Sequence, residues 1–493
     1  MKFKPKILQI ATKGPLIAIL NKIDVQLLNL SALDRIKIKK KEKRKVVAID
    51  IAYGKKEVSP GEIGLFLDVA EELNIKEDDE VEVSLESKPE SLQYIKKKLD
   101  KKELSKIEID KIIKDLLANK LTEIEATYFV AACYINKMSL DESAYLTEAI
   151  VKNSGRLKFN KKPIVDKHSI GGLAGNRTTP IIVSIVAAAG LTIPKTSTRS
   201  ITSPSGTSDT MEVLAPVSHS KEKIMEIVKK TNACMVWGGT LDLASADDKL
   251  IQLEKPLSLD PEGFLLASIL AKKSAVDSSH ILIDIPIGRE AKIESKKRAK
   301  DLAKKFITLG KKLNMKIKVI ITDGSQPIGN GVGPALEAKD ILLILQNRNG
   351  PEDLKKKAVY MAGLIFEMVG YKNGYKKALE ILESGKAYKK MQEIIKEQGG
   401  NPNIQPENIK LGIYPYTFRS RTSGKISYIS NKLITKLAKS AGAPNNKGAG
   451  VYLHKKLNTK INVNEPLFTI YAESKDKLTF ALKENLNNVM KIS

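Results

Sequence analysis

Residues 166–179 read DKHSIGGLAGNRTT, residues 195–207 read KTSTRSITSPSGT, and an apolar segment at 180–191 lies between these two polar loops. The apolar segment predicts a buried helix. Glycines let backbone N–H groups approach an anion closely, while hydroxyl, lysine and arginine side chains add hydrogen-bond donors and positive charge. Two such loops, brought together by one short buried element, could hold one phosphate group or two. The stretch from 166 to 210 therefore predicts a phosphate-binding site around which the chain is organised.

The residues just before the first loop, Pro163, Ile164 and Val165, have the character of a strand. A strand that leads into a glycine loop and then a helix points backbone amides at an anion. The Walker sequence GxxxxGK[ST] is absent from the chain, so the predicted site is not a P-loop. The alternative interpretation is a polar loop that only caps the helix from 176 onward.

The composition is that of a globular protein with an excess of positive charge. The chain has 493 residues, enough for two to four domains, with an apolar fraction of 42% and a charged fraction of 28%. The formal charge of +26 suggests nucleic acid or another polyanion as a partner. The favoured alternative is a lysine-rich surface, because the basic residues are spread along the chain and only 37–45 forms a dense run. Aromatic residues make up just 5%, which leaves few platforms for stacking bases.

Cysteine and histidine usage gives no metal or disulfide pattern. Cys133 and Cys234 lie in no CxxC sequence and near no histidine at ligand spacing, and the four histidines are scattered. The first 20 residues lack the continuous apolar stretch of a signal peptide, and no segment reaches the roughly 18 apolar residues of a membrane span. We expect a cytoplasmic protein with no metal, no cofactor and no membrane association.

The first 86 residues predict a β-rich accessory or oligomerisation domain. Strands are expected at 16–20, 46–52 and 81–85. A helix is expected to open at Ser59 and to bury a face made of Ile63, Phe66, Leu67, Ala70 and Leu73. The pattern is loosely similar to small double-psi β-barrels, and a plain α+β domain explains it equally well.

Residues 87–155 predict a helical domain. Three capping-box patterns occur in succession, each before an amphipathic run, at Ser105 and Glu108, Thr122 and Glu125, and Ser139 and Glu142. Helices near 245–275 are candidates to join this domain.

Residues 156–400 predict an α/β domain that binds phosphate and nucleotide, because apolar strands alternate with helices along this part of the chain. Strands are expected at 233–237, 280–286 and 315–322, and helices at 219–230, 263–275, 294–313 and 352–369. A polar linker follows, and residues 408–493 predict a C-terminal α+β domain with a helix near 430–441. The expected fold class is therefore a multidomain α/β protein.

Two further segments are candidates for chemistry. Asp260 lies just before an apolar helix, where an aspartate is commonly an N-cap. Beside Leu and Phe side chains its carboxyl group could instead have a raised pKa and donate a proton, and the sequence leaves both interpretations open. Asp247 and Asp248 are adjacent and so point to different faces of any helix, which argues against a paired-carboxylate mechanism. The glycine-rich segment 323–334 is a ligand-facing loop, a hinge or a tight structural turn.

Taken together, these segments resemble the thymidine/pyrimidine nucleoside phosphorylase family over residues 88–485. The motifs that carry the resemblance are Lys167-His168-Ser169-x-Gly171-Gly172, Ser197-x-Arg199, Gly206-Thr207-x-Asp209, the run from Ser268 to Lys273, and the 323–334 loop. The family architecture is a helical domain, an α/β phosphate-binding domain and a C-terminal α+β domain.

The sequence also departs from the family pattern in three places. The Tyr-x-x-Arg-Asp stretch that contacts a pyrimidine base is replaced by 251–255, IQLEK, and the GGVGD segment is replaced by 171–176, GGLAGN. The N-terminal 86 residues are an addition. All three departures are shared with the archaeal AMP phosphorylases, which the sequence resembles over its whole length.

That resemblance implies phosphorolysis of nucleoside 5′-monophosphates in nucleotide catabolism, with AMP and phosphate giving adenine and ribose 1,5-bisphosphate. CMP and UMP would be further substrates, and a homodimer or larger homo-oligomer is implied. A pyrimidine nucleoside phosphorylase for thymidine or uridine is the alternative within the same class, and a basic nucleic-acid-binding protein is the alternative from another class.

The resemblance also assigns roles to residues. Asp260 would be the proton donor, and the attacking phosphate would be held by Lys167, Ser169, Thr179 and Ser197, with Thr207 beside them. The nucleotide would be bound by Gly172, Thr198, Arg199, Ser200, Ile201, Thr202, Ser203, Thr207, Ser268 and Lys292. The chemistry agrees with these residue types, since an acid protonates the departing base while clustered donors and cations hold two anions.

Overall fold

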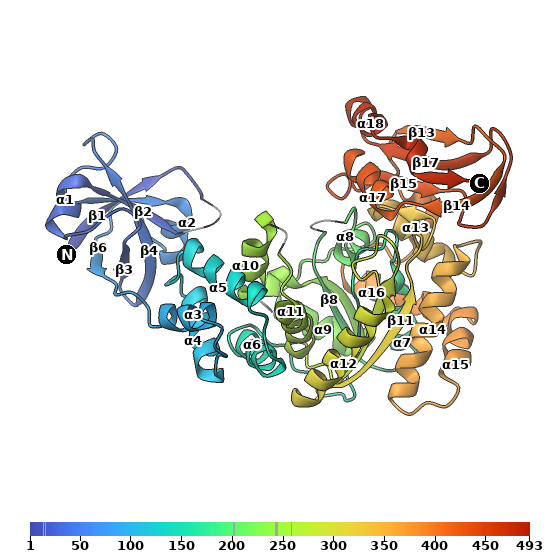
Figure 1. Ribbon diagram of the computed structural model, residues 1–493, viewed down its shortest axis with the longest axis horizontal. Helices are drawn as coiled ribbons and strands as arrows, with labels where there is room; N and C mark the ends of the chain where they lie inside the picture. Colours follow the sequence, from blue (N-terminus) through green and yellow to red (C-terminus); the bar gives the residue numbers. More distant parts are fainter. Residues whose placement is uncertain (13, 15, 201–202, 242–244, 258) are drawn as a thin grey trace. The chain divides into compact units, whose positions relative to one another are not determined.

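The computed structural model describes residues 1–12, 14, 16–200, 203–241, 245–257 and 259–493 (Figure 1). The chain forms two compact units. The first consists of Met1–Ser154 and Ala244–Ala271, and the second of Gly155–Leu243 and Lys272–Ser493. Within the described ranges, no helix is long and apolar enough to cross a membrane.

The N-terminal part of the first unit is a closed six-stranded barrel in the order β1–β5–β2–β4–β3–β6 (Figure 1). Its strands are β1 (Lys2–Leu8), β2 (Ile17–Asn21), β3 (Arg35–Lys40), β4 (Lys43–Ala52), β5 (Glu62–Phe66) and β6 (Val81–Leu85). Two short helices accompany them, α1 (Lys22–Leu27) and α2 (Leu67–Leu73). Fully buried aliphatic side chains such as Leu20, Ile36 and Ile49 fill the interior. The barrel leaves no open sheet edge, which removes a site for unwanted strand pairing.

The prediction of a helix from Ser59 is wrong for the first half of that segment. Residues 62–66 are strand β5, which pairs parallel with β1 and antiparallel with β2, and the helix begins only at Leu67. Ile63 and Leu65 are apolar at a spacing that suits a strand as well as a helix, and both are buried in the barrel. Pairing with two neighbours therefore decides the local structure, because sheet formation depends on distant partners.

The rest of the first unit is a helical bundle. It contains α3 (Ser91–Leu99), α4 (Lys106–Leu117), α5 (Glu123–Ile135), α6 (Leu140–Lys152), α10 (Ser245–Glu254) and most of α11 (Glu262–Ala275). All three expected capping boxes are present, at the N-termini of α4, α5 and α6. Phe264 of α11 lies with its ring centroid 5.6 Å from that of Phe129, so α11 packs into the same core as α5.

The centre of the second unit is a parallel sheet. It consists of a three-stranded part in the order β11–β10–β7 and a two-stranded part, β8–β9. The strands are β7 (Val165–Ser169), β8 (Ile193–Ser197), β9 (Ala233–Trp237), β10 (His280–Ile287) and β11 (Lys316–Asp323). A parallel bridge between Ile164 and Thr192 joins the two parts. All five strands run in one direction, so their carboxyl ends lie at one edge, where ligands of open α/β sheets bind.

Helix α7 (Thr178–Ala188) is buried from Thr178 to Ala187, as the apolar segment predicts. It packs against α14 and α16 in the main core of the unit. The other helices are α8 (Thr207–Met211), α9 (Lys221–Thr231), α12 (Lys296–Lys312), α13 (Pro334–Leu345), α14 (Glu352–Met368), α15 (Gly374–Glu383) and α16 (Lys386–Glu397).

The C-terminal part of the second unit is an α+β domain with two small sheets, in the orders β12–β15–β17–β13 and β16–β14–β18 (Figure 1). Its strands are β12 (Gly331–Val332), β13 (Tyr414–Arg419), β14 (Gly424–Ile429), β15 (Gly450–Leu453), β16 (Lys460–Ile461), β17 (Pro466–Ala472) and β18 (Met490–Ile492). Two helices complete it, α17 (Asn431–Ser440) and α18 (Lys475–Leu482). The predicted fold class is confirmed: helical, α/β and C-terminal α+β parts are all present, with a β-rich N-terminus.

Candidate functional site

The loops that follow β7, β10 and β11 pack against one another at the carboxyl edge of the parallel sheet. A Cβ atom on Gly172 would lie 2.7 Å from the backbone nitrogen of Lys292, and one on Gly175 would lie 2.3 Å from the carbonyl oxygen of Ile328. Both glycines also have positive φ angles, +90° and +68°. Only glycine satisfies the close approach and the backbone conformation together. The sequence-predicted residues Gly172 and Lys292 are thus neighbours.

Lys167 lies on strand β7 rather than in the glycine loop, and its side chain is buried. Its Nζ donates a hydrogen bond of 3.0 Å to Oγ1 of Thr179 in the first turn of α7. Burial lowers the pKa of Lys167 to about 7, although the carboxylate of Asp284 opposes that shift. The structure therefore brings two of the predicted phosphate-binding residues into direct contact.

Ser169, the last residue of β7, belongs to a buried polar network around Asp284. Its Oγ donates to Oδ2 of Asp284 at 2.7 Å and accepts from the amide of Asn176 at 3.1 Å. Asp284 also accepts from Thr322 at 2.6 Å and pairs with Lys357 at 2.9 Å. Burial acts to raise the pKa of Asp284, but the charge of Lys357 and the hydrogen bonds outweigh it and lower the pKa. The hydroxyl of Ser169 is therefore held beside a carboxylate that stays ionised.

A second buried carboxylate, Asp166, pairs with two lysines. Its oxygens lie 3.2 Å from Nζ of Lys195 on β8 and 2.8 Å from Nζ of Lys273 on α11. Burial acts to raise the pKa of Asp166, and the charges of the two lysines outweigh it and lower the pKa. Burial also lowers the pKa of Lys273. At Asp166, the second residue of β7, two lysines therefore surround one carboxylate.

The loop between β8 and α8 is closed by Asp209. Its Oδ2 accepts N–H groups from Ser200 at 2.7 Å and from Gly206 at 2.8 Å. Within this loop Oγ of Ser203 donates to the carbonyl of Ser205 at 3.0 Å, and Thr198 is exposed. Two of the residues predicted to bind nucleotide, Ile201 and Thr202, lie outside the described residues.

Ser197 and Thr207 frame the two ends of this loop. The hydroxyl groups of Ser197 and Ser208 lie 2.7 Å apart. Oγ1 of Thr207 accepts a hydrogen bond of 3.2 Å from Arg177, whose Nε donates to Glu337 at 2.7 Å. Arg177 therefore links the loop after β7 to the loop after β8.

Arg199 is held by protein partners. Its guanidinium group binds both carboxylate oxygens of Glu212, one of them at 2.6 Å, and lies 5.1 Å from the ring centroid of Trp237. The hydrogen bond from Arg199 is the main cause that lowers the pKa of Glu212 to about 2, and Lys447 adds to it. Trp237 pairs with Ser197 across β8 and β9, so the only tryptophan of the chain lies beside the loop.

The two remaining predicted residues, Asp260 and Ser268, belong to the first unit. Asp260 is exposed, and the carbonyl of Pro261 accepts the N–H groups of Phe264 and Leu265. Pro261 therefore occupies the N-cap position of α11, and Asp260 lies one residue before it. Oγ of Ser268 donates to the buried carboxylate of Asp247 at 2.9 Å.

Several residues of the site have no role in the sequence-based prediction. In the second unit they are Arg177, Lys195, Asp284, Lys357 and Trp237. In the first unit, taken by itself, Asp247 contacts Ser268. Asp284 did leave a signal, because it is a single charge inside the apolar strand HILIDIPI, and a buried charge needs a partner. The partners themselves come from three other elements, β7, β11 and α14, and could not be identified from the sequence.

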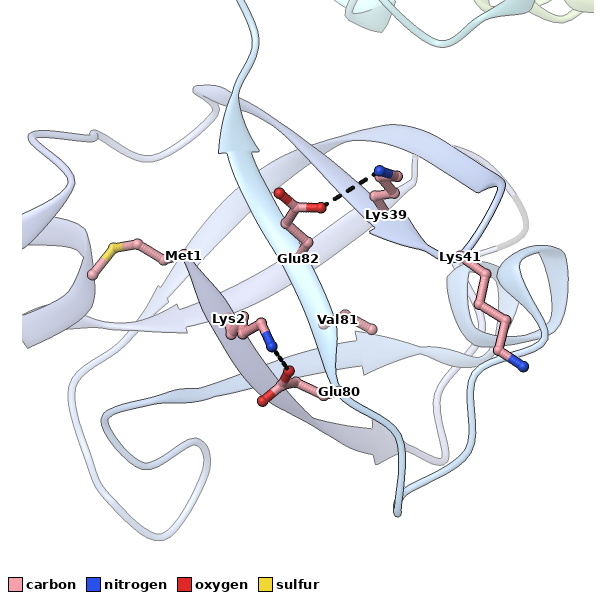
Figure 2. A pocket seen from close by; sticks show the side chains of 7 residues that line it. All are labelled: Met1, Lys2, Lys39, Lys41, Glu80, Val81 and Glu82. Atoms are coloured by element: carbon pink, nitrogen blue, oxygen red, sulfur yellow. Dashed lines mark ion pairs between the residues drawn. The ribbon is translucent and has the colours of Figure 1, made fainter.

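The basic run at 37–45 lies on the barrel and is paired with acidic residues. Lys37 pairs with Glu86 at 2.7 Å and Lys39 with Glu82 at 3.7 Å, and Lys40 and Lys45 pair with Asp79 and Glu72. Figure 2 shows a hollow near this run in which Lys2 and Lys39 each face a glutamate. These pairs offset the local charge that a nucleic acid would need.

Over the described ranges, no group of three or more His, Cys, Asp or Glu side chains could hold a metal ion. Cys133 and Cys234 are both buried free thiols.

Three family models match the chain. Residues 161–388 match the a/b domain of the glycosyl transferase family, 92–154 match the helical bundle domain of that family, and 425–493 match the pyrimidine nucleoside phosphorylase C-terminal domain. The matches follow the α/β, helical and C-terminal parts described above.

Curated relatives are similar over nearly the whole length. The AMP phosphorylase of Thermococcus sibiricus is 47% identical over 485 residues, which cover 98% of this chain and 96% of the relative. That of Pyrococcus furiosus is 48% identical with the same coverage. Among solved structures, anthranilate phosphoribosyltransferase from Thermus thermophilus has a TM-score of 0.50 at 18% identity and covers 62% of this chain and 98% of its own. That last likeness concerns the fold alone.

Proposed function

This chain belongs to the AMP phosphorylase family, and from that premise we propose that it cleaves AMP with inorganic phosphate to adenine and ribose 1,5-bisphosphate. It is a pentosyltransferase, since the glycosyl transferase family model covers its central domain. The geometric observation that carries the proposal is the contact between Lys167 and Thr179 beside a cluster of cations, Lys357, Arg177 and Lys273, whose charges act on Lys167. Such a cluster favours an anion over a neutral ligand.

The proposed roles follow from the chemistry of each group. Lys167, Ser169, Thr179 and Ser197 hold the attacking phosphate, because an ammonium group and hydroxyl groups together supply charge and donors. Gly172, Thr207, Ser268, Lys292 and the residues from Thr198 to Ser203 bind the nucleotide. Asp260 is the proton donor. Support for the phosphate assignment comes from the position of Ser169 and Ser197 at the carboxyl ends of β7 and β8 and of Thr179 at the start of α7. Lys167, in the middle of β7, reaches Thr179 through its side chain.

In the proposed reaction a phosphate oxygen forms a bond to the anomeric carbon of the ribose as the bond from that carbon to the base nitrogen breaks. The electron pair of the broken bond goes to the base, and the carboxyl group of Asp260 supplies a proton to it. Protonation of a leaving group contributes typically about 10²–10⁴-fold in rate. Fixed donors and cations at the phosphate lower the cost of bringing two anions together.

CMP and UMP are proposed as additional substrates, and the protein is proposed to work in the cytoplasm as a homodimer or larger homo-oligomer. The residues 251–255, IQLEK, at the end of α10 and just after it, provide neither the Tyr nor the Arg with which nucleoside phosphorylases contact a pyrimidine base. That difference argues for a nucleotide rather than a nucleoside.

A substrate comparison tests the proposal. Release of free base is measured from AMP, CMP, UMP, adenosine and thymidine, each with and without inorganic phosphate. We expect phosphate-dependent cleavage of AMP and no cleavage of adenosine or thymidine. Cleavage of thymidine or adenosine without cleavage of AMP would overturn the proposal and favour a nucleoside phosphorylase.

A further inference from the structure

The segment 288–293, which follows β10 and carries Lys292, is attached to the C-terminal domain through Glu290. The carboxylate of Glu290 accepts hydrogen bonds from Oγ of Ser430 at 3.1 and 3.0 Å and from the backbone N–H of Lys432 at 2.9 Å. Ser430 is the N-cap residue of α17, and its Oγ also accepts from the N–H of Leu433 at 3.1 Å. Glu290 therefore caps a helix whose N-cap residue lies 140 residues later in the chain.

The N-terminus of α17 is a favourable position for the carboxylate of Glu290. The N-terminus of a helix carries a partial positive charge and unpaired N–H groups, so an anion there is stabilised. Burial acts to raise the pKa of Glu290, while the hydrogen bonds from Lys432, Tyr428 and Ser430 outweigh it and lower the pKa. Glu290 is thus held as an ionised carboxylate against α17.

Two neighbours fix the same segment from other directions. The guanidinium group of Arg289 lies 5.0 Å from the ring centroid of Tyr428, which is also in the C-terminal domain. A Cβ atom on Gly288 would lie 2.3 Å from the carbonyl oxygen of Gly324, so the segment touches the turn after β11. The segment then returns to the strand edge, where Ile293 forms a bridge with Ile287.

Lys292 lies between the Glu290 attachment and this bridge. Its side chain is exposed, and its backbone nitrogen is the atom that a Cβ on Gly172 would approach to 2.7 Å. A shift of the segment away from α17 would therefore move Lys292 relative to Gly172. Both residues are proposed above to bind the nucleotide.

We propose that Glu290 is a positioning residue, which holds the segment 288–293 against the N-terminus of α17 so that Lys292 stays beside Gly172 for the nucleotide. The inference rests on the proposed function. It gives the C-terminal domain, which supplies none of the proposed substrate-binding residues, a direct influence on nucleotide affinity.

Glu290→Ala tests this inference, with Glu294→Ala as the matched control. Glu294 is exposed and lies two residues beyond Lys292, so its variant removes the same charge at the same distance along the chain. We expect Glu290→Ala to raise the KM for AMP about 10-fold, the usual scale for losing hydrogen bonds to a charged group. In Glu290→Ala the kcat and the KM for phosphate should stay within about 2-fold of wild type, because the hydrogen bonds that are lost hold only the nucleotide segment. The control Glu294→Ala should match wild type in all three constants.

Two further variants separate positioning from a general loss of structure. In Glu290→Gln the amide oxygen still accepts from Lys432 and Ser430, so most of the AMP affinity should return. In a Lys292→Ala background Glu290→Ala should cause little further change in the KM for AMP, because the residue through which it acts is gone.

The outcomes are distinct. An unchanged KM for AMP in Glu290→Ala, or an equal loss with and without Lys292, would overturn the inference while wild-type AMP cleavage still supports the proposed function. A wild-type protein that neither binds AMP in calorimetry nor cleaves it would overturn the proposed function and the inference together.

Discussion

The ammonium group of Lys167 donates a 3.0 Å hydrogen bond to the hydroxyl of Thr179, and this contact joins strand β7 to the first turn of helix α7. The two elements are separated by the glycine loop 170–177. Their contact places a buried cation where the N-terminus of α7 adds its own partial positive charge. Mutation of Lys167 or Thr179 should therefore change the affinity for phosphate before any other property.

Thr179→Val removes the hydroxyl group and keeps the size of the side chain. Loss of a hydrogen bond to a charged group costs about 1.5–3 kcal/mol, so we expect the KM for phosphate to rise by about 10-fold or more. Initial rates against phosphate at saturating AMP measure it. Thr127→Val is the control, since its exposed hydroxyl donates to the carbonyl of Glu123 in the other unit. An unchanged phosphate KM would remove Thr179 from the site.

The pH dependence of phosphate binding should follow Lys167. Burial lowers its pKa to about 7, so the side chain is charged below that pH and loses its proton as the pH rises through it. Phosphate prefers the charged form, and the wild-type KM for phosphate should therefore rise above pH 7. Lys167→Arg keeps its charge because a guanidinium group titrates above about pH 12. The ratio of the wild-type KM to the Lys167→Arg KM should increase with pH, and a flat ratio would contradict the assignment.

The same pKa has a consequence for stability. The folded-state pKa of about 7 lies below the ordinary lysine value of 10.5, so the unfolded state binds more protons between these two values. The contribution of Lys167 to the free energy of unfolding should therefore increase as the pH rises from about 7 towards 10.5. Urea denaturation of wild type and Lys167→Met at several pH values measures it, and the gain should be absent from the variant.

Asp260→Asn removes the proposed proton donor with little change in shape. We expect kcat for AMP to fall about 10²–10⁴-fold, the contribution typical of general acid catalysis. Circular dichroism and the unfolding midpoint should match wild type, because Asp260 is exposed and precedes α11. Asp100→Asn, at the exposed C-cap of α3, is the control. Retention of wild-type kcat would transfer the proton donation to another group.

Asp166→Asn tests the buried cluster rather than the chemistry. The change leaves Lys195 and Lys273 without their carboxylate, and breaking a buried ion pair in this way typically costs about 3–5 kcal/mol. The free energy of unfolding from urea titration should fall by that order. Glu226→Gln, whose pairs with Lys223 and Lys230 are on the surface, should leave the urea midpoint unchanged. Equal midpoints for all three proteins would show that the cluster adds no stability.

Binding to nucleic acid should be absent despite the net charge. The run at 37–45 is the densest basic segment, and four of its lysines pair with acidic residues. A titration of labelled duplex DNA and of RNA at low and physiological salt measures the affinity. Salt-sensitive binding that persists near physiological ionic strength would revive the nucleic-acid hypothesis.

Features set by nearby residues were predictable from the sequence. The three capping boxes form as expected, because each needs only a serine or threonine and a glutamate three residues later. Helix α7 was equally predictable, because an apolar run of that length between two polar loops is typical of a buried helix. The fold class follows from the same local signals, together with the resemblance.

Features set by distant partners were not predictable. The helix expected from Ser59 begins only at Leu67, because β1 and β2 take residues 62–66 as a strand. Strand β7 likewise extends through Ser169, so Lys167 and Ser169 lie in the sheet rather than in the glycine loop. Asp284, their neighbour, is 115 residues from Ser169, and Glu290 meets Ser430 across 140 residues. Such contacts depend on the folded chain, and periodicity within a short window does not contain them.

Strand β12 shows that the C-terminal domain is not a detachable module. Its two residues, Gly331 and Val332, come from the loop that packs on Gly175, yet they pair with Tyr452 and Val451 of β15. A chain that ended near residue 400 would leave this loop without its partner strand. The boundary near residue 400 in the sequence therefore does not separate two parts that can fold or move independently. Changes made in the C-terminal domain can reach the proposed substrate-binding loops through the backbone of β12.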